Sequence, residues 1–140
     1  MTFKRCAVLA AITLTLAAQT RDTYKARLSA LPADARTRAA MAGSGSATAT
    51  LEGSKLSITG SFEGLVSSAT TAELHSAVAA GVRGPVIAPL TIPKATSGTI
   101  TGSIDLTPPQ LTSLQHGGLY VQIQSEKVPD GVLWGWFLKK

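Results

Sequence analysis

The sequence predicts an all-β fold in which about eight short strands form a mainly antiparallel sandwich or barrel. Two observations lead to this prediction. From Tyr24 onward, apolar and polar residues alternate as they do along strands with one buried face, and turn residues separate the alternating segments. No long helical pattern intervenes that could connect parallel strands, so neighbouring strands are expected to pair antiparallel.

The strands are expected over residues 24–31, 46–51, 56–62, 72–78, 85–90, 98–106, 119–124 and 132–138. In the first of these, Tyr24, Ala26 and Leu28 fall on one side, opposite Lys25 and basic or hydroxyl neighbours. Residues 52–55 have the length and composition of a hairpin turn between the second and third strands.

One short helix is expected to interrupt the strands after residue 107. Thr107 suits the N-cap, Pro108 suits the first helical position, and Gln110 completes a capping box. Leu111 begins the apolar side of this helix, and Gly117 suits the position that follows its last turn.

Residues 1–20 are expected to form an apolar helix that serves as a signal peptide or a retained membrane anchor. Lys4 and Arg5 precede residues 6–18, which carry no charge and end with the small residues Thr15, Ala17 and Ala18, suited to a cleavage site. This apolar run is shorter than the roughly 20 residues of a membrane-spanning helix. Cys6 is the single cysteine, so a cleaved chain has no disulfide. We therefore expect an exported, periplasmic or extracellular protein with one β-domain over residues 21–140.

The composition argues for a packed domain and against a nucleic-acid partner. Hydrophobic residues make up 44% of the chain and charged residues 15%, which is far from the composition of a disordered protein. The net charge is +5, but no basic stripe with interleaved aromatic residues is present. The basic residues between Arg21 and Arg38 are interpreted as a solvated edge, with attraction to anionic lipid or an acidic partner as the alternative.

The order of several short motifs resembles the CHRD (chordin) domain family. The motifs are FxGL at 62–65, ATTAELH at 69–75, GPVI at 84–87, LTPxQL at 106–111, GLYV at 118–121 and GxLxG at 131–135. The family occurs in chordin and in many bacterial exported proteins. The resemblance implies an immunoglobulin-like Greek-key β-sandwich, distantly similar to Cu/Zn superoxide dismutases, with no defined enzymatic activity.

This chain departs from the family pattern at several positions that are usually histidine or polar. The family usually has a histidine on each side of the hydrophobic residue that is Leu74 here, whereas this chain has Glu73 and His75. Gln124 stands where a histidine is usual. Val132, Trp134 and Trp136 stand where the closing family motif usually has polar side chains.

Glu73 and His75 are weak candidates for a metal site, because residues two apart on a strand project from the same face. A copper or zinc site needs three or four ligands, and the chain has only two histidines, so a hydrogen-bonded surface pair is the favoured interpretation. His116 is expected to cap the helix C-terminus. We expect no metal or other cofactor, and no enzymatic activity, because nucleophile-elbow and phosphate-loop motifs are absent.

The last expected strand is apolar on both faces. One face carries Val132, Trp134, Trp136 and Leu138, and the other carries Leu133, Gly135 and Phe137. A strand with one face in water should alternate with polar residues. Leu133 and Phe137 match inward hydrophobic positions of the family, so we expect the face of Trp134 and Trp136 to bind a partner. In the alternative, these tryptophans fill a gap left by the lost polar residues or pack under the N-terminal helix.

The leading functional hypothesis is a non-enzymatic binding or assembly module outside the cytoplasm. Its partner is expected to be a protein, for example in a membrane complex of which this chain is an accessory subunit, and retained residues 1–20 would add membrane contact. Two alternatives stay open. One is a small metal-binding protein of superoxide dismutase type with a degenerate site at Glu73 and His75, and the other is an adhesive or carbohydrate-binding surface module.

The export assignment predicts the mass and location of the native protein. Because residues 1–20 have the charge and apolar pattern of a targeting segment, the native chain should have lost residues up to about Ala18 or should remain in the membrane fraction. Intact-mass measurement after cell fractionation checks this expectation. Full-length protein that is soluble in the cytoplasm would contradict it.

Overall fold

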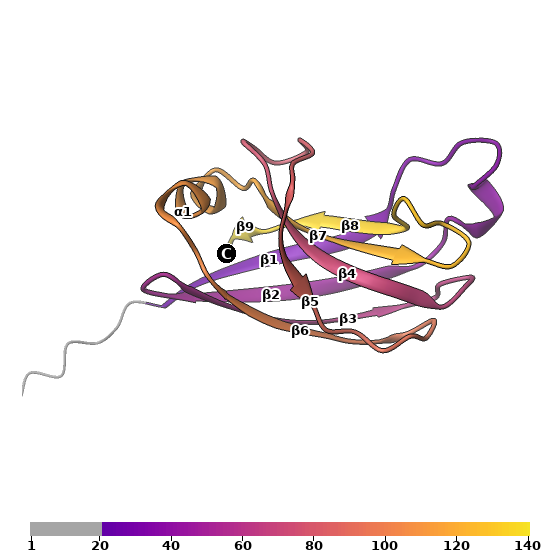
Figure 1. The fold of residues 1–140 in the computed structure, drawn as a ribbon, viewed down its shortest axis with the longest axis horizontal. Helices are drawn as coiled ribbons and strands as arrows, with labels where there is room; N and C mark the ends of the chain where they lie inside the picture. The colour runs from indigo at the N-terminus through magenta and orange to yellow at the C-terminus, as the bar shows by residue number, and fades with distance from the viewer. Residues whose placement is uncertain (1–20) are drawn as a thin grey trace, which may run out of the picture.

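The computed structural model describes residues 21–140 and shows nine strands with one short α-helix (Figure 1). The strands are β1 (Arg21–Ala30), β2 (Ser44–Glu52), β3 (Lys55–Glu63), β4 (Ala69–Ser76), β5 (Val86–Leu90), β6 (Gly98–Asp105), β7 (Leu119–Ser125), β8 (Leu133–Trp136) and β9 (Leu138–Lys139). The helix α1 covers Pro108–Gln115, and a 3-10 turn covers Arg38–Ala40. The expected N-terminal apolar helix lies outside the described residues.

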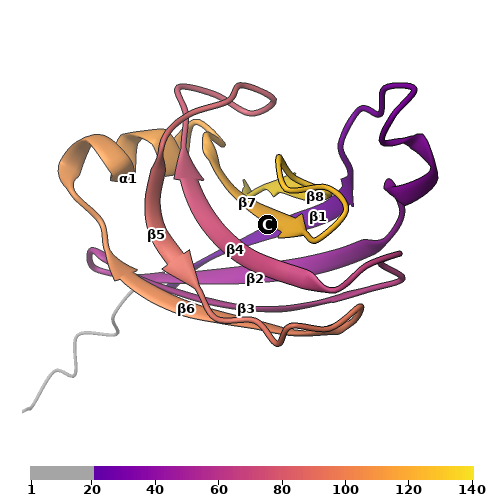
Figure 2. The same ribbon diagram turned by 45° about the vertical axis from the view of Figure 1, so that its right-hand side comes forward.

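The strands form one sheet that closes almost completely on itself (Figure 2). Their order is β5-β4-β7-β8-β1-β2-β3-β6, and every paired neighbour is antiparallel. The two ends of this order meet at a single bridge, in which Thr91 and Thr101 exchange backbone hydrogen bonds of 2.8 and 3.0 Å. The predicted all-β, antiparallel class with one short helix is therefore confirmed, while the immunoglobulin-like Greek-key arrangement stays a prediction.

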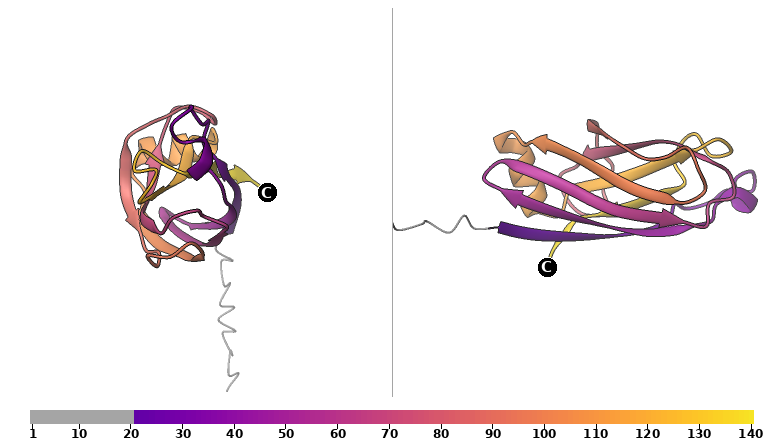
Figure 3. Two further views of the ribbon diagram at one scale, coloured as in Figure 1. Left: turned by 90° about the vertical axis from the view of Figure 1, so that its right-hand side faces the viewer. Right: turned by 90° about the horizontal axis from the view of Figure 1, so that it is seen from below.

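Strand β1 joins the two halves of this ring. It pairs along most of its length with β2, and its last residues, Ser29 and Ala30, pair with Trp134 and Leu133 of β8. One half consequently contains β1, β2, β3 and β6, and the other contains β5, β4, β7 and β8. The end-on view in Figure 3 shows the two halves enclosing a common interior.

Local sequence signals account for the turns and the helix. The β2–β3 hairpin turns at Gly53, whose φ of 62° lies in the left-handed region that favours glycine. At the start of α1, the Gln110 side chain accepts a 3.0 Å hydrogen bond from the Thr107 N–H, as the capping-box pattern predicts. At its end, His116 occupies the C-cap, where its backbone N–H bonds to the Thr112 carbonyl. Within residues 21–140, no helix has the length and apolarity needed to cross a membrane.

The interior is filled by the apolar residues of the alternating segments. Leu28, Ile58, Leu74, Ile123 and Phe137 are each at most 1% exposed and belong to one continuous core. Each such side chain contributes on the order of 1.5–3 kcal/mol by leaving water. The core therefore unites both halves of the ring.

The last expected strand, 132–138, is divided in two. β8 pairs with β7 through Trp136, and β9 then pairs with β1. Phe137 stands between them, fully buried, with its N–H bonded to the Leu119 carbonyl at 2.9 Å. The chain thus leaves β7 after Phe137 and keeps β1 as its neighbour, which a sequence pattern with a period of two does not reveal.

Gly135 is required by the close approach of β8 to β1. A β-carbon at this position would fall on the backbone carbonyl of Arg27 and lie 2.8 Å from a methyl group of Leu28. The first of these contacts is with backbone, which cannot move without disturbing the β1–β8 pairing.

Gly135→Ala should therefore reduce the free energy of unfolding by about 1–3 kcal/mol, the usual cost of overpacking. Urea denaturation followed by circular dichroism measures this change. Ser103→Ala, on the exposed side of β6, is the control and should change stability little. Equal stability of the two variants would contradict the close approach.

Candidate functional site

Strand β7 is buried on both faces, although it belongs to an antiparallel sheet. Tyr120 and Gln122, which point away from the main core, are only 1% and 7% exposed. An antiparallel sheet usually leaves one face in water. Here two loops cover that outer face, namely residues 77–85 between β4 and β5 and residues 126–132 between β7 and β8. We call residues 77–85 the covering loop.

Four rings, from His75, Tyr120, Trp136 and Trp134, form a row across the outer face of β4, β7 and β8. We call this set the aromatic row. His75 stacks on Tyr120 with ring centroids 4.7 Å apart, and Tyr120 meets Trp136 at 4.9 Å. Trp136 meets Trp134 edge to face at 4.8 Å. The row follows from strand register, because Tyr120 is paired with both His75 and Trp136.

The covering loop is fastened to the aromatic row by its own backbone groups. Tyr120 Oη accepts a hydrogen bond from the Gly84 N–H at 3.0 Å and donates one to the Gly84 carbonyl at 3.1 Å. His75 Nδ1 lies 2.9 Å from the same carbonyl oxygen. Trp136 donates its ring N–H to the Val82 carbonyl at 3.3 Å. The loop joining β4 to β5 at the top of Figure 2 is thus held from beneath by three of the four rings.

Arg83 completes the cover at the other end of the row. Its guanidinium carbon lies 4.8 Å from the ring centroid of Trp134, which is the geometry of a cation–π contact. Such a contact holds the planar guanidinium against the indole face while its edge stays available to an acceptor.

A chain of polar side chains continues the row along β4 and β7. Thr71 donates its hydroxyl to Gln124 Oε1 at 2.9 Å, and Gln124 donates its amide to Glu73 Oε2 at 3.2 Å. Glu73 Oε2 lies 3.4 Å from His75 Nε2. The expectation that Glu73 and His75 share a face is confirmed. His75 is only 8% exposed, however, so the pair is not the surface pair that the sequence suggested.

The structure brings together two of the ligands that a metal centre would need. Glu73 and His75 face one another, but the part of the chain from residue 21 onward contains no group of three His, Cys, Asp or Glu side chains placed to hold a metal. We therefore assign no metal to this pair.

The four residues expected to bind a partner are not all on the surface. Trp134 and Trp136 are half-buried beneath the covering loop, and Leu138 is 55% exposed. Val132 is fully buried in the core, so it cannot belong to an exposed face. The reason is that Val132 precedes β8 and follows the turn at Gly131, whose φ is 125°.

Sequence reasoning missed the contributions of Tyr120 and Arg83. Tyr120 appeared in the sequence only as part of an expected strand and of the GLYV motif, and Arg83 only as one residue of a connection. The apolar residues of the covering loop, above all Val78 and Val82, were the available signal, because a solvated connection is usually polar. That Tyr120 and Arg83 contact the outer layer of the domain follows from the three-dimensional arrangement of the strands and the covering loop.

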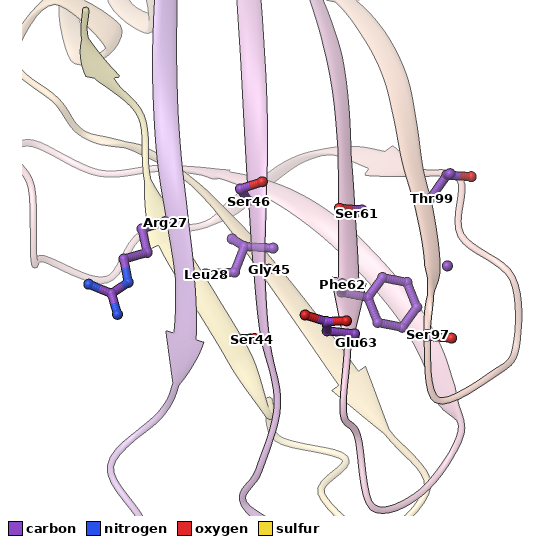
Figure 4. A pocket seen from close by; sticks show the side chains of 11 residues that line it. Arg27, Leu28, Ser44, Gly45, Ser46, Ser61, Phe62, Glu63, Ser97 and Thr99 are labelled. Atoms are coloured by element: carbon purple, nitrogen blue, oxygen red, sulfur yellow. The ribbon is translucent and has the colours of Figure 1, made fainter.

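A separate hollow of about 630 Å³ lies on the other half of the ring (Figure 4). Its lining is dominated by small and hydroxyl-bearing residues of β2, β3 and β6, over the buried side chains of Leu28 and Phe62. Arg27 and Glu63 stand at its margins, and within the described residues neither forms an ion pair. We assign no chemistry to this hollow.

A smaller hollow of about 160 Å³ adjoins the covering loop, between Arg83 and Asp130. Asp34 also lines it, but its carboxylate is engaged in its own turn. The backbone N–H and hydroxyl of Thr37 and the backbone N–H of Arg36 bond to this carboxylate and lower the pKa of Asp34. The acid is therefore a turn-forming residue.

A family model for the CHRD domain matches residues 14–135, which is most of the chain. The chain belongs to the CHRD domain family. The resemblance seen in the sequence motifs is thereby confirmed. Searches of curated proteins and of solved structures found no match.

Most of the positions at which the sequence motifs indicated departures from the usual family pattern lie together in space. Glu73, Gln124, Trp134 and Trp136 all belong to the outer face of β4, β7 and β8, beneath or beside the covering loop. Val132 is the exception, because it is in the core. The outer face of β4, β7 and β8 is therefore where these expected departures gather, and we take it as the candidate functional site.

Tyr120→Phe should loosen the covering loop, because it removes the hydroxyl that bonds twice to Gly84. The expected loss in the free energy of unfolding is about 1–3 kcal/mol, since a partly buried N–H is left without a partner. Urea denaturation measures it. Tyr24→Phe is the matched control, because Tyr24 is also buried and no hydrogen bond of its hydroxyl occurs in the described structure. Similar losses in both variants would contradict this account of the loop.

Proposed function

We propose that this CHRD domain is a non-enzymatic, extracytoplasmic binding module that holds a protein partner on the outer face of β4, β7 and β8. The single observation that supports this most is the gathering of exposed apolar side chains around the two tryptophans. Of the five large hydrophobic residues exposed in the described chain, Val78 and Val82 belong to the covering loop, Val86 is paired with His75, and Leu138 lies near Ala80 of the covering loop at Gly117. We call these four exposed residues the apolar rim.

The apolar rim borders the aromatic row on several sides. Val86 is paired with His75, and the Val82 carbonyl accepts the ring N–H of Trp136. A β-carbon at Gly117 would touch both Leu138 and Ala80, a residue of the covering loop. The exposed residues thus belong to, or lie beside, the covering loop and the aromatic row. Apolar patches of this kind on soluble domains commonly mark interfaces, and tryptophan and arginine are the side chains most often found at the energetic centre of an interface.

The chemistry of the site favours binding over catalysis. The buried histidine of the row bonds through Nδ1 to a main-chain carbonyl, and no hydroxyl or thiol among the described residues bonds to its ring. The Tyr120 hydroxyl donates to the Gly84 carbonyl, and the Thr71 hydroxyl donates to Gln124. A nucleophile paired with a general base, the usual arrangement for covalent catalysis, is therefore not assembled here.

The proposed location is the periplasm or the cell exterior. CHRD domains are typically extracellular, and the charge pattern of residues 1–20 is that of a targeting segment. A module of this kind could serve as an accessory subunit of a membrane complex, with the apolar rim directed toward the larger protein.

Replacing rim residues by acids tests the proposal without touching the core. Val78→Asp combined with Leu138→Asp places two charges where the side chains are 76% and 55% exposed, so the fold should persist while the partner is lost. Introducing charge into an apolar interface is expected to weaken association by more than about 2 kcal/mol, or roughly 30-fold. The measurement is mass spectrometry of what co-purifies from the native membrane and periplasm.

Two controls make this experiment decisive. Val66→Asp changes the remaining exposed hydrophobic residue, 45% exposed, and should retain the partner. Trp134→Ala with Trp136→Ala should leave the domain folded, as judged by circular dichroism, and should also detach the partner. Collapse of the β signal in the double tryptophan variant, together with full partner retention in the rim variant, would show that these tryptophans only cover β7.

A further inference from the structure

The two ring nitrogens of His75 face groups of the same kind. Nδ1 lies 2.9 Å from the Gly84 carbonyl oxygen, and Nε2 lies 3.4 Å from Glu73 Oε2. A carbonyl oxygen and an ionised carboxylate can only accept hydrogen bonds. Nδ1 must therefore carry the hydrogen that bonds to Gly84.

When only Nδ1 carries a hydrogen, the Nε2 atom of His75 has no hydrogen-bond donor opposite it. The atom is buried and, within the described chain, makes no hydrogen bond, although it is near enough to Glu73 for an ion pair. A neutral imidazole would direct the Nε2 lone pair at a carboxylate, so two acceptors would face each other. Burying such an unsatisfied pair is costly, and one added proton between the two atoms removes the cost.

Among residues 21–140, no other nearby group can supply this hydrogen. Tyr120 stacks on the imidazole, but its hydroxyl is already bonded to Gly84. Gln124 donates its amide to the same carboxylate oxygen and does not reach the histidine. Arg83, the only charged residue of the covering loop, lies over Trp134. Neither β5 nor β8 contains a titratable side chain.

We infer that Glu73 and His75 together bind one proton, and that this proton fastens the covering loop over the aromatic row. With the proton present, Nε2–H points at the carboxylate, and the bond from Nδ1–H to the Gly84 carbonyl is strengthened by the positive charge of the ring. When the proton leaves to bulk water, the carboxylate repels the Nε2 lone pair. The ring then turns, and Gly84 loses a donor.

The direction of the pH effect follows from this arrangement. The protonated pair stabilises the closed loop, so the loop is closed at lower pH and loosens as pH rises. Loosening uncovers Trp134 and Trp136, because both are in contact with loop residues through Arg83 and Val82. The inference concerns the isolated domain. Only its consequence, that a partner meets more tryptophan surface at higher pH, rests on the proposed function.

The test uses the tryptophans as reporters, since the chain contains two and both lie under the covering loop. Acrylamide quenching of their fluorescence is measured in the purified protein from about pH 5 to about pH 8, where histidine side chains generally change charge. A metal chelator is present throughout. The quenching constant of the unmodified protein should rise with pH while the far-ultraviolet circular dichroism stays constant.

Glu73→Gln is the decisive variant. A glutamine amide can donate its own N–H to Nε2, so the loop should stay closed and the quenching constant should stay low at every pH. Glu63→Gln, an exposed carboxylate on β3 in the other half of the ring, is the matched control and should keep the rise. A quenching constant that does not change with pH in the unmodified protein, or a rise that persists in Glu73→Gln, would overturn the inference.

Nitrogen NMR of the imidazole rings gives an independent readout that requires no variant. At low pH the His75 ring should carry hydrogens on both nitrogens, and at high pH on one nitrogen only. A single hydrogen on the ring at every pH would also overturn the inference. None of these measurements involves a partner, so failure here is distinct from failure of the binding proposal.

Discussion

The burial of β7 on both faces is the constraint on which the rest of the site depends. Its inner face is covered by apolar side chains, which need no partners. Its outer face is covered by loops, and loops bring backbone N–H and carbonyl groups that must be hydrogen-bonded. The Gly84 carbonyl is hydrogen-bonded by Tyr120 and His75, and the Val82 carbonyl by the ring N–H of Trp136. In the second loop, Gln122 donates its amide to the Asp130 carbonyl at 2.9 Å. The side chains beneath the loops are therefore aromatic or amide residues with a polar end.

Much of the fold could be predicted because strand and helix signals are local. Alternation from Tyr24 to Leu28 and the capping box at Thr107 depend on neighbouring residues, and both are seen in the structure. That Glu73 and His75 share a face followed from the two-residue period of a strand. Which strands lie next to residues 132–138 could not be predicted from neighbouring residues in the sequence. The burial of Val132 depends on the turn at Gly131, and the break at Phe137 depends on which strands are adjacent.

Trp134 and Trp136 can both pack as part of the domain and contribute to a partner-binding surface. Each indole is half-buried and contacts the covering loop, so the tryptophans contribute to the second, outer layer of the domain. The parts left exposed adjoin Val82 and the rest of the apolar rim. A layer of this kind, built where the family usually has polar side chains, couples the stability of a loop to the availability of a surface. The same residues can thus serve structure and recognition.

The single bridge between Thr91 and Thr101 gives the ring of strands a seam. Every other neighbouring pair along the ring is joined by at least two residue pairs, so this bridge is the shortest connection in the ring. An opened seam would present the free edges of β5 and β6, which are templates for self-association. Pro89 lies within β5 and has no N–H to donate, which makes that edge a poor template. The chain thus limits aggregation at the place where its sheet is least continuous.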